Sequence, residues 1–130
     1  MIIDTSAVVA ILNGEPDASA FAKAIQGAAE CRMSAATYLE LAAVVERTRD
    51  PIASRLLDDF LARMRIEIMP VTVDQALIAR RAYWDYGKGS GHKAGLNFGD
   101  CFSYALARER REQLLFKGND FIHTDVLAAL

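Results

Sequence analysis

Short apolar stretches alternate with longer amphipathic ones along this chain. MIID, AECRMS, IEIMPV and LLF are short and bounded by polar or turn residues, which is typical of buried strands. The segments between them repeat apolar residues at helical spacing. Strands and helices in alternation indicate a parallel sheet, because right-handed crossovers place helices on both of its faces. The pattern predicts an α/β fold, a three-layer α/β/α domain with a small parallel sheet of four or five strands.

The helical stretches carry recognisable start and stop signals. Ser34 is placed to cap one helix, Thr72 another, and Thr5 or Ser6 the first. Pro16 suits the first turn of a helix. We expect helices within 5–14, 15–28, 35–50, 52–65, 72–89 and 100–111, and a final helical piece after a turn at 117–125. The glycine-rich stretch GKGSGHKAGLNFG is expected to be a loop.

Length and composition favour a single domain over residues 1–130, without a membrane helix. The longest apolar run, AVVAIL, is far shorter than the roughly 18 residues that span a bilayer. The N-terminus lacks the basic region and the small-residue cleavage site of a secretory signal, so we expect a cytoplasmic protein. Cys31 and Cys101 lie far apart without a metal-binding spacing, and we expect both to be small core residues.

Four acidic residues stand where such a fold could bring them together. Asp4 follows the first predicted strand and Asp120 follows the fourth, so both belong to the carboxyl edge, where ligands bind in open α/β sheets. Glu40 lies on a predicted helix, and Asp100 opens another directly after the glycine-rich loop.

Each acid also has a purely structural explanation, except Glu40. Asp4 alone would be a helix cap, Asp100 a helix-start acid and Asp120 a turn residue. Glu40 has no Lys or Arg three or four residues away, and its helical neighbours are apolar. We therefore expect a buried carboxylate, which would need a partner.

Convergent carboxylates repel one another unless they are protonated or bridged by a metal ion. Oxygen ligands without His or Cys select Mg²⁺ or Mn²⁺ rather than zinc. Such an ion activates water and stabilises a leaving oxygen, which suits phosphodiester hydrolysis. The formal net charge of −2 lacks the basic footprint of a nucleic-acid binder, although bound cations would reverse the charge locally.

Four blocks of the chain resemble a known family. MIIDTSAVVAIL, MSAATYLELAAVV, LNFGDCFSYALA and LLFKGNDFIHTD resemble, in residue type and order, the conserved blocks of PIN-domain ribonucleases, specifically VapC-type toxins of bacterial toxin–antitoxin pairs. The likeness covers nearly the whole chain. It implies a PIN-like fold and metal-dependent cleavage of RNA that leaves a 5′-phosphate and a 3′-hydroxyl.

The resemblance also implies site residues and partners. The metal-binding and catalytic acids would be Asp4, Glu40, Asp100 and Asp120. Thr5 or Ser6 would supply a hydroxyl near the ion, and Asn119 a hydrogen bond, while Asp125 competes with Asp120 as the fourth acid. The family further implies a homodimer and silencing by a separate VapB-type antitoxin chain.

Contacts to RNA are less defined by the sequence. Lys88, His92 and Lys93 either meet phosphates from the flexible loop or form a solvated loop. Trp84 or Tyr86 either stacks on an unpaired base or packs in the core or a dimer interface.

Two other functions compete with this interpretation. An aspartate-nucleophile phosphatase also begins with a strand ending in Asp, but it needs a second Asp where Ser6 stands. A binding module of the same fold without turnover would have no reason to maintain four repelling acids.

Overall fold

The four short apolar stretches form one parallel sheet. The computed structural model describes all 130 residues, and its strands are β1 (Ile2–Ile3), β2 (Cys31–Ser34), β3 (Ile66–Met69) and β4 (Leu114–Leu115). Their order is β3-β2-β1-β4, and every pairing is parallel. The predicted α/β class and a four-stranded sheet are confirmed.

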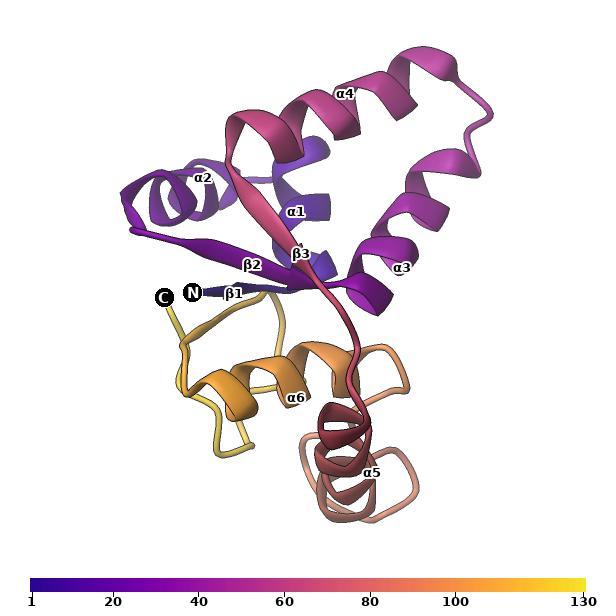
Figure 1. Cartoon of the computed structure of the whole chain (residues 1–130), viewed down its shortest axis with the longest axis vertical. Coiled ribbons are helices and arrows are strands. Elements are labelled where there is room, and N and C mark those ends of the chain that lie inside the picture. The colour runs from indigo at the N-terminus through magenta and orange to yellow at the C-terminus, as the bar shows by residue number, and fades with distance from the viewer.

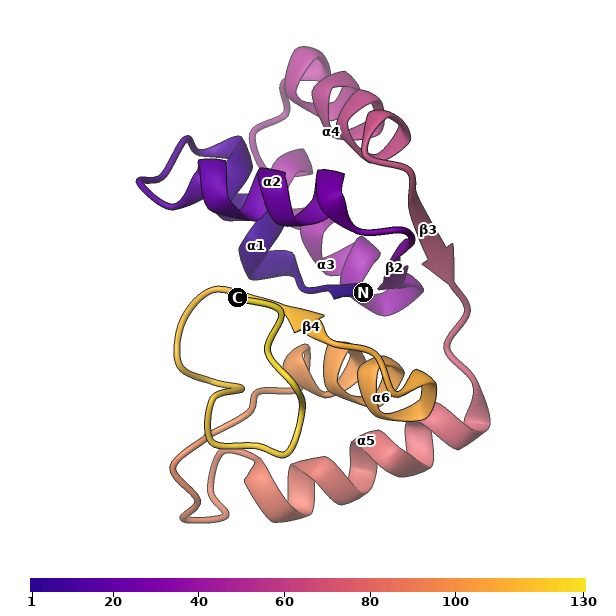
Figure 2. The same ribbon diagram turned by 90° about the vertical axis from the view of Figure 1, so that its left-hand side faces the viewer.

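Six helices cover the sheet on both faces. They are α1 (Thr5–Leu12), α2 (Ala18–Gly27), α3 (Ala35–Glu46), α4 (Pro51–Arg63), α5 (Val73–Tyr86) and α6 (Asp100–Arg110). Helices α1 to α4 lie on one face and α5 and α6 on the other (Figures 1 and 2). None of them is long and apolar enough to cross a membrane.

Side-chain caps begin most of these helices, as the sequence predicts for two of them. Ser34 accepts a hydrogen bond from Ala36 N in α3, and Thr72 accepts one from Gln75 N in α5. Helix α1 is capped by Asp4 rather than by a hydroxyl. The placement of Pro16 inside a helix was wrong, because α2 begins only at Ala18.

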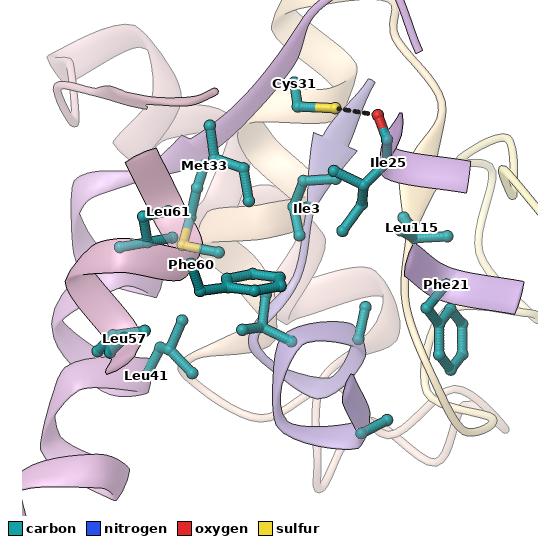
Figure 3. Close-up of a cluster of buried hydrophobic side chains, with 14 residues drawn as sticks. Ile3, Phe21, Ile25, Cys31, Met33, Leu41, Leu57, Phe60, Leu61 and Leu115 are labelled. Atoms are coloured by element: carbon teal, nitrogen blue, oxygen red, sulfur yellow. Dashed lines mark hydrogen bonds between the residues drawn. The ribbon is translucent and has the colours of Figure 1, made fainter. Parts of the chain in front are cut away.

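The core consists of two apolar clusters separated by the sheet. Ile2 and Ile3 are adjacent, and since side chains alternate along a strand they enter opposite clusters. The larger cluster gathers side chains of α1 to α4 around Ile3, Met33 and Phe60 (Figure 3).

Both cysteines are core residues, as predicted. Cys31 and Cys101 are buried and free. Burial raises the pKa of the Cys31 thiol and raises that of Cys101 to about 11. Both thiols are therefore protonated at neutral pH and behave as small apolar side chains.

The predicted final helical piece is absent, and that expectation was wrong. After β4 the chain runs through turns, and Phe121 is inserted into the second cluster. Leu114 N then donates to Leu127 O and Leu114 O accepts from Ala129 N, at 2.8 and 3.0 Å. Pairing with the open edge of β4 satisfies this backbone, whereas so short a terminal helix would be marginal alone.

Candidate active site at the carboxyl edge of the sheet

Asp4 is a buried carboxylate held by three hydrogen bonds. It lies at the end of β1 with only 5% of its surface exposed. Its Oδ2 accepts from Ser6 N at 3.0 Å and from Ser6 Oγ at 2.6 Å. Its Oδ1 accepts from Ser103 Oγ at 2.6 Å. These donors offset the cost of burying the carboxylate, so Asp4 is both the cap of α1 and a fixed group at this edge.

Glu40 is exposed, which corrects the expectation that it is buried. The buried side of α3 carries Thr37 and Leu41, and the neighbouring Val44 is itself exposed. The apolar neighbours of Glu40 at helical spacing therefore gave a wrong prediction of its burial. Glu40 nevertheless has a partner, because Thr5 Oγ1 donates to its Oε2 at 2.9 Å.

A glycine lets the loop before α6 approach Glu40. A Cβ placed on Gly99 would lie 2.5 Å from Glu40 Oε1, closer than real Cβ atoms come to other atoms. Any larger residue at position 99 would displace the carboxylate. Sequence reasoning missed Gly99, although a glycine directly before the helix-start acid was a usable signal.

Asp100 is the first residue of α6 and the most perturbed acid of the chain. Its Oδ2 accepts from Asn97 N at 2.8 Å, while Asn97 Oδ1 accepts from Asp100 N at 2.9 Å. Burial most of all, together with the negative charges of Asp4, Asp120 and Glu40, raises the pKa of Asp100 to about 7, although the hydrogen bond from Asn97 lowers it. The other three acids are thus close enough to act on Asp100.

The two candidates for the fourth acid, Asp120 and Asp125, differ in their contacts. Asp125 accepts a hydrogen bond from Tyr104 Oη at 2.6 Å, and its carboxylate lies 3.3 Å from Arg108 Nη2. Asp120 is exposed, forms no ion pair and acts on Asp100 by its charge. Asn119 is also exposed, and its assignment stays a prediction.

The glycine-rich segment forms the predicted loop. A single bridge between Gly87 and Leu96 closes its base. Lys88, His92 and Lys93 are exposed, and neither lysine is in an ion pair. Their contact with RNA stays a prediction.

The two aromatic candidates at the end of α5 differ in burial. Trp84 is 79% exposed. Tyr86 is half-buried, with its ring centroid 4.9 Å from that of His92 and 5.9 Å from that of Tyr104. Tyr86 is therefore the packed residue of the pair.

Two buried hydroxyl groups near Asp4 were not predicted from the sequence. Thr37 and Ser103 are 1% and 0% exposed, and their oxygens lie 3.0 Å apart. Each stands three residues from a candidate acid on the same helix, Thr37 before Glu40 and Ser103 after Asp100. Helical spacing placed them beside the acids, but only the fold joins the two helices.

The donor set fits a hard divalent cation by its chemistry. Four carboxylates without His or Cys are the ligands that Mg²⁺ and Mn²⁺ prefer, and the raised pKa of Asp100 marks a place where positive charge is favoured. No three acidic, His or Cys side chains stand close enough to hold an ion as they are arranged. Glu40 and Asp120 lie at the surface, outside the packed core.

Comparison of the fold with solved structures shows the same architecture in toxin–antitoxin proteins. A toxin–antitoxin complex from Klebsiella pneumoniae matches with a TM-score of 0.75 and 17% identity, over 99% of this chain and 97% of that one. VapBC2 from Rickettsia felis, bound to a promoter DNA fragment, matches with a TM-score of 0.76 and 16% identity, over 98% and 94%. At such identity the likeness concerns the fold alone.

Sequence comparison identifies the family. The PIN domain family model matches residues 1–127. VapC ribonuclease Mb0625 of Mycobacterium bovis is 57% identical over 130 residues, covering 100% of this chain and 98% of the relative. Ribonuclease VapC42 of Mycobacterium tuberculosis is 50% identical over 129 residues, covering 99% and 98%. This chain therefore belongs to the PIN-domain family, among the VapC ribonucleases, as its four sequence blocks predicted.

Proposed function

We propose that this chain, acting as one domain, is the toxin of a type II toxin–antitoxin system, an endoribonuclease that hydrolyses RNA phosphodiester bonds and so arrests translation and growth. The observation that carries the proposal is the carboxylate of Asp100, whose pKa is raised to about 7 by burial and by the charges of three further acids at the same edge. A fold gains nothing from such repulsion unless a cation or a proton relieves it. The relatives named as ribonucleases support the same conclusion.

The metal ligands in this proposal are Asp4, Asp100, Glu40 and Asp120. A divalent ion, Mg²⁺ with Mn²⁺ as a substitute, would supply an activated water and stabilise the leaving oxygen. The chain's own hydroxyls keep the carboxylates in place, Ser6 at Asp4 and Thr5 at Glu40.

Asp100 must lose its proton before it can act as a ligand, because its pKa lies near neutrality. The remaining supporting group would be Asn119, as a hydrogen-bond donor to the substrate or the water.

RNA would reach the acids past the glycine-rich loop. Lys88, His92 and Lys93 are exposed there, and lysines without acidic partners are available to phosphates. The substrate would be cellular RNA, so we place the protein in the cytoplasm.

The proposed protein partners are a VapB-type antitoxin and a second copy of the chain. Solved structures of the same fold are described as toxin–antitoxin and VapBC complexes. Self-association is supported by β3, which is an edge strand, and by exposed apolar side chains on α3 and α5, including Leu39, Val73, Leu77 and Trp84.

The proposal is tested by incubating antitoxin-free protein with total cellular RNA in Mg²⁺, Mn²⁺ or EDTA, beside Asp4→Asn. We expect discrete cuts with 5′-phosphate and 3′-hydroxyl ends that disappear in EDTA and in the variant. If folded wild-type protein with metal cuts no RNA, the binding module without turnover becomes the better interpretation. Equal cutting by a folded Asp4→Asn variant would refute the assignment of the acids.

A further inference from the structure

We infer that the buried hydroxyls of Thr37 and Ser103 are positioning residues that orient the Asp4 carboxylate and join the segments that carry the four acids. The inference rests on the proposed function, since it concerns how the same acids are arranged.

The first observation is a directed pair of hydrogen bonds. Ser103 Oγ lies 2.6 Å from Asp4 Oδ1, and an ionised carboxylate only accepts, so Ser103 gives its proton to Asp4. Thr37 Oγ1 lies 3.0 Å from the same Ser103 oxygen. Ser103 has no second proton to donate, so Thr37 is the donor of that bond. Since donors in a chain polarise one another, Thr37 strengthens the bond from Ser103 to Asp4.

The other carboxylate oxygen is held by Ser6. Ser6 donates both its N–H and its hydroxyl to Asp4 Oδ2, and the Ser6 oxygen accepts from Lys117 N at 2.9 Å. Asp4 Oδ2 thus receives two donors and Oδ1 only one. A carboxylate oxygen offers about two acceptor sites. Oδ1 is therefore the oxygen with a free site, and Ser103 determines how that site is presented.

The same hydrogen bonds tie together the segments that carry the acids. Thr37 is three residues before Glu40 on α3, Ser103 is three residues after Asp100 on α6, and Lys117 is three residues before Asp120. All three are connected to Asp4 through hydroxyls. A change at Ser103 would consequently disturb the spacing of α3 and α6 as well as Asp4 itself.

A purely structural role makes a different prediction. If Thr37 and Ser103 only satisfied buried polar atoms, removing a hydroxyl would lower the melting temperature and leave metal affinity unchanged. Groups that orient metal ligands instead change the affinity, by about 10- to 100-fold in known metal sites.

The test measures Mn²⁺ binding by calorimetry with antitoxin-free protein, and the melting temperature in EDTA. Ser103→Ala is compared with wild type and with Ser19→Ala, an exposed serine on α2. We expect Ser103→Ala to raise the Kd for Mn²⁺ about 10-fold or more, and Ser19→Ala to leave it unchanged.

Two variants of Thr37 separate the effect of losing the hydroxyl donor from the effect of changing the shape of the side chain. Thr37→Val keeps the shape and loses the donor, whereas Thr37→Ser keeps the donor. We expect Thr37→Val to raise the Kd about fivefold and Thr37→Ser to bind as wild type does. This pair decides the question even if Ser103→Ala does not fold.

Two outcomes would overturn the inference, and they are distinguishable. Unchanged Mn²⁺ affinity in folded Ser103→Ala and Thr37→Val, with wild type binding normally, would leave only a structural role. Wild type that neither binds Mn²⁺ nor cuts RNA would remove the proposed function, and the inference with it.

Discussion

Replacing Asp100 with asparagine is expected to stabilise the metal-free protein, and increasingly so as the pH rises. Asparagine has nearly the same shape, and its carbonyl oxygen can still accept the hydrogen bond from Asn97 N. The substitution removes only the charge that burial and the three neighbouring acids disfavour.

The direction in which stability changes with pH follows from proton linkage. The pKa of Asp100 is about 7 in the folded protein against 3.8 for an unperturbed Asp. Between these values the unfolded chain has released the proton and the folded protein retains it, so rising pH favours unfolding. The loss of folding stability in the wild type begins near pH 4 and is complete above pH 7. The asparagine side chain does not titrate, so the Asp100→Asn variant escapes this loss.

The magnitude has an upper limit of about 4 kcal/mol, since each pKa unit corresponds to about 1.36 kcal/mol. Asp100 is only partly buried, and screening by water reduces the effect to about 1–2 kcal/mol. For a chain of 130 residues this amounts to roughly 3 to 8 °C in melting temperature.

The assay is thermal unfolding followed by circular dichroism in EDTA at pH 5, 6, 7 and 8. The control is Asp58→Asn, because Asp58 is exposed on α4 and forms no ion pair. We expect the advantage of Asp100→Asn to grow between pH 5 and 7 and then level off, and Mn²⁺ to stabilise wild type alone. A pH-independent difference, or a less stable variant at pH 8, would refute the reasoning.

Three further predictions concern the neighbouring groups. Glu40→Gln should raise the Kd for Mn²⁺ while the melting temperature in EDTA changes by less than about 2 °C, because Glu40 is exposed; a rise of several degrees would contradict this. Gly99→Ala should displace the Glu40 carboxylate and lower RNA cleavage about tenfold, whereas Gly27→Ala, where a Cβ meets nothing, should not. The double substitution Lys88→Gln and Lys93→Gln, made in an inactive Asp4→Asn background, should reduce the slope of log RNA affinity against log salt concentration by about 1.4. Fluorescence anisotropy measures this slope, and the control Lys23→Gln should leave it unchanged. An unchanged slope in the double variant would exclude phosphate contacts by these lysines.

Local features of the fold were predictable because local physics sets them. The caps Ser34 and Thr72 act within their own helices. The two residues of β1 and of β4 are fully buried on both faces of the sheet, and this leaves an uninterrupted apolar run in the sequence.

Features that depend on tertiary pairing were not predictable. The segment after Asp125 looks helical alone, but residues 127–129 pair with Leu114. Glu40 looks buried on its helix, but α3 turns that side outward. The hydrogen bond between Ser103 and Asp4 joins residues 99 positions apart, so the sequence near either residue does not predict it.

Asp4, directly after β1, and Asp100, at the start of α6, differ in how far hydrogen bonds stabilise their negative charge. This difference predicts different roles for them in metal binding. Asp4 receives three hydrogen bonds, so its charge is compensated by the protein itself. Asp100 receives one, from Asn97 N, and its raised pKa shows that this is insufficient. A proton and a divalent cation therefore compete for Asp100. Metal affinity should consequently fall as the pH drops below about 7, because Asp100 then takes up a proton.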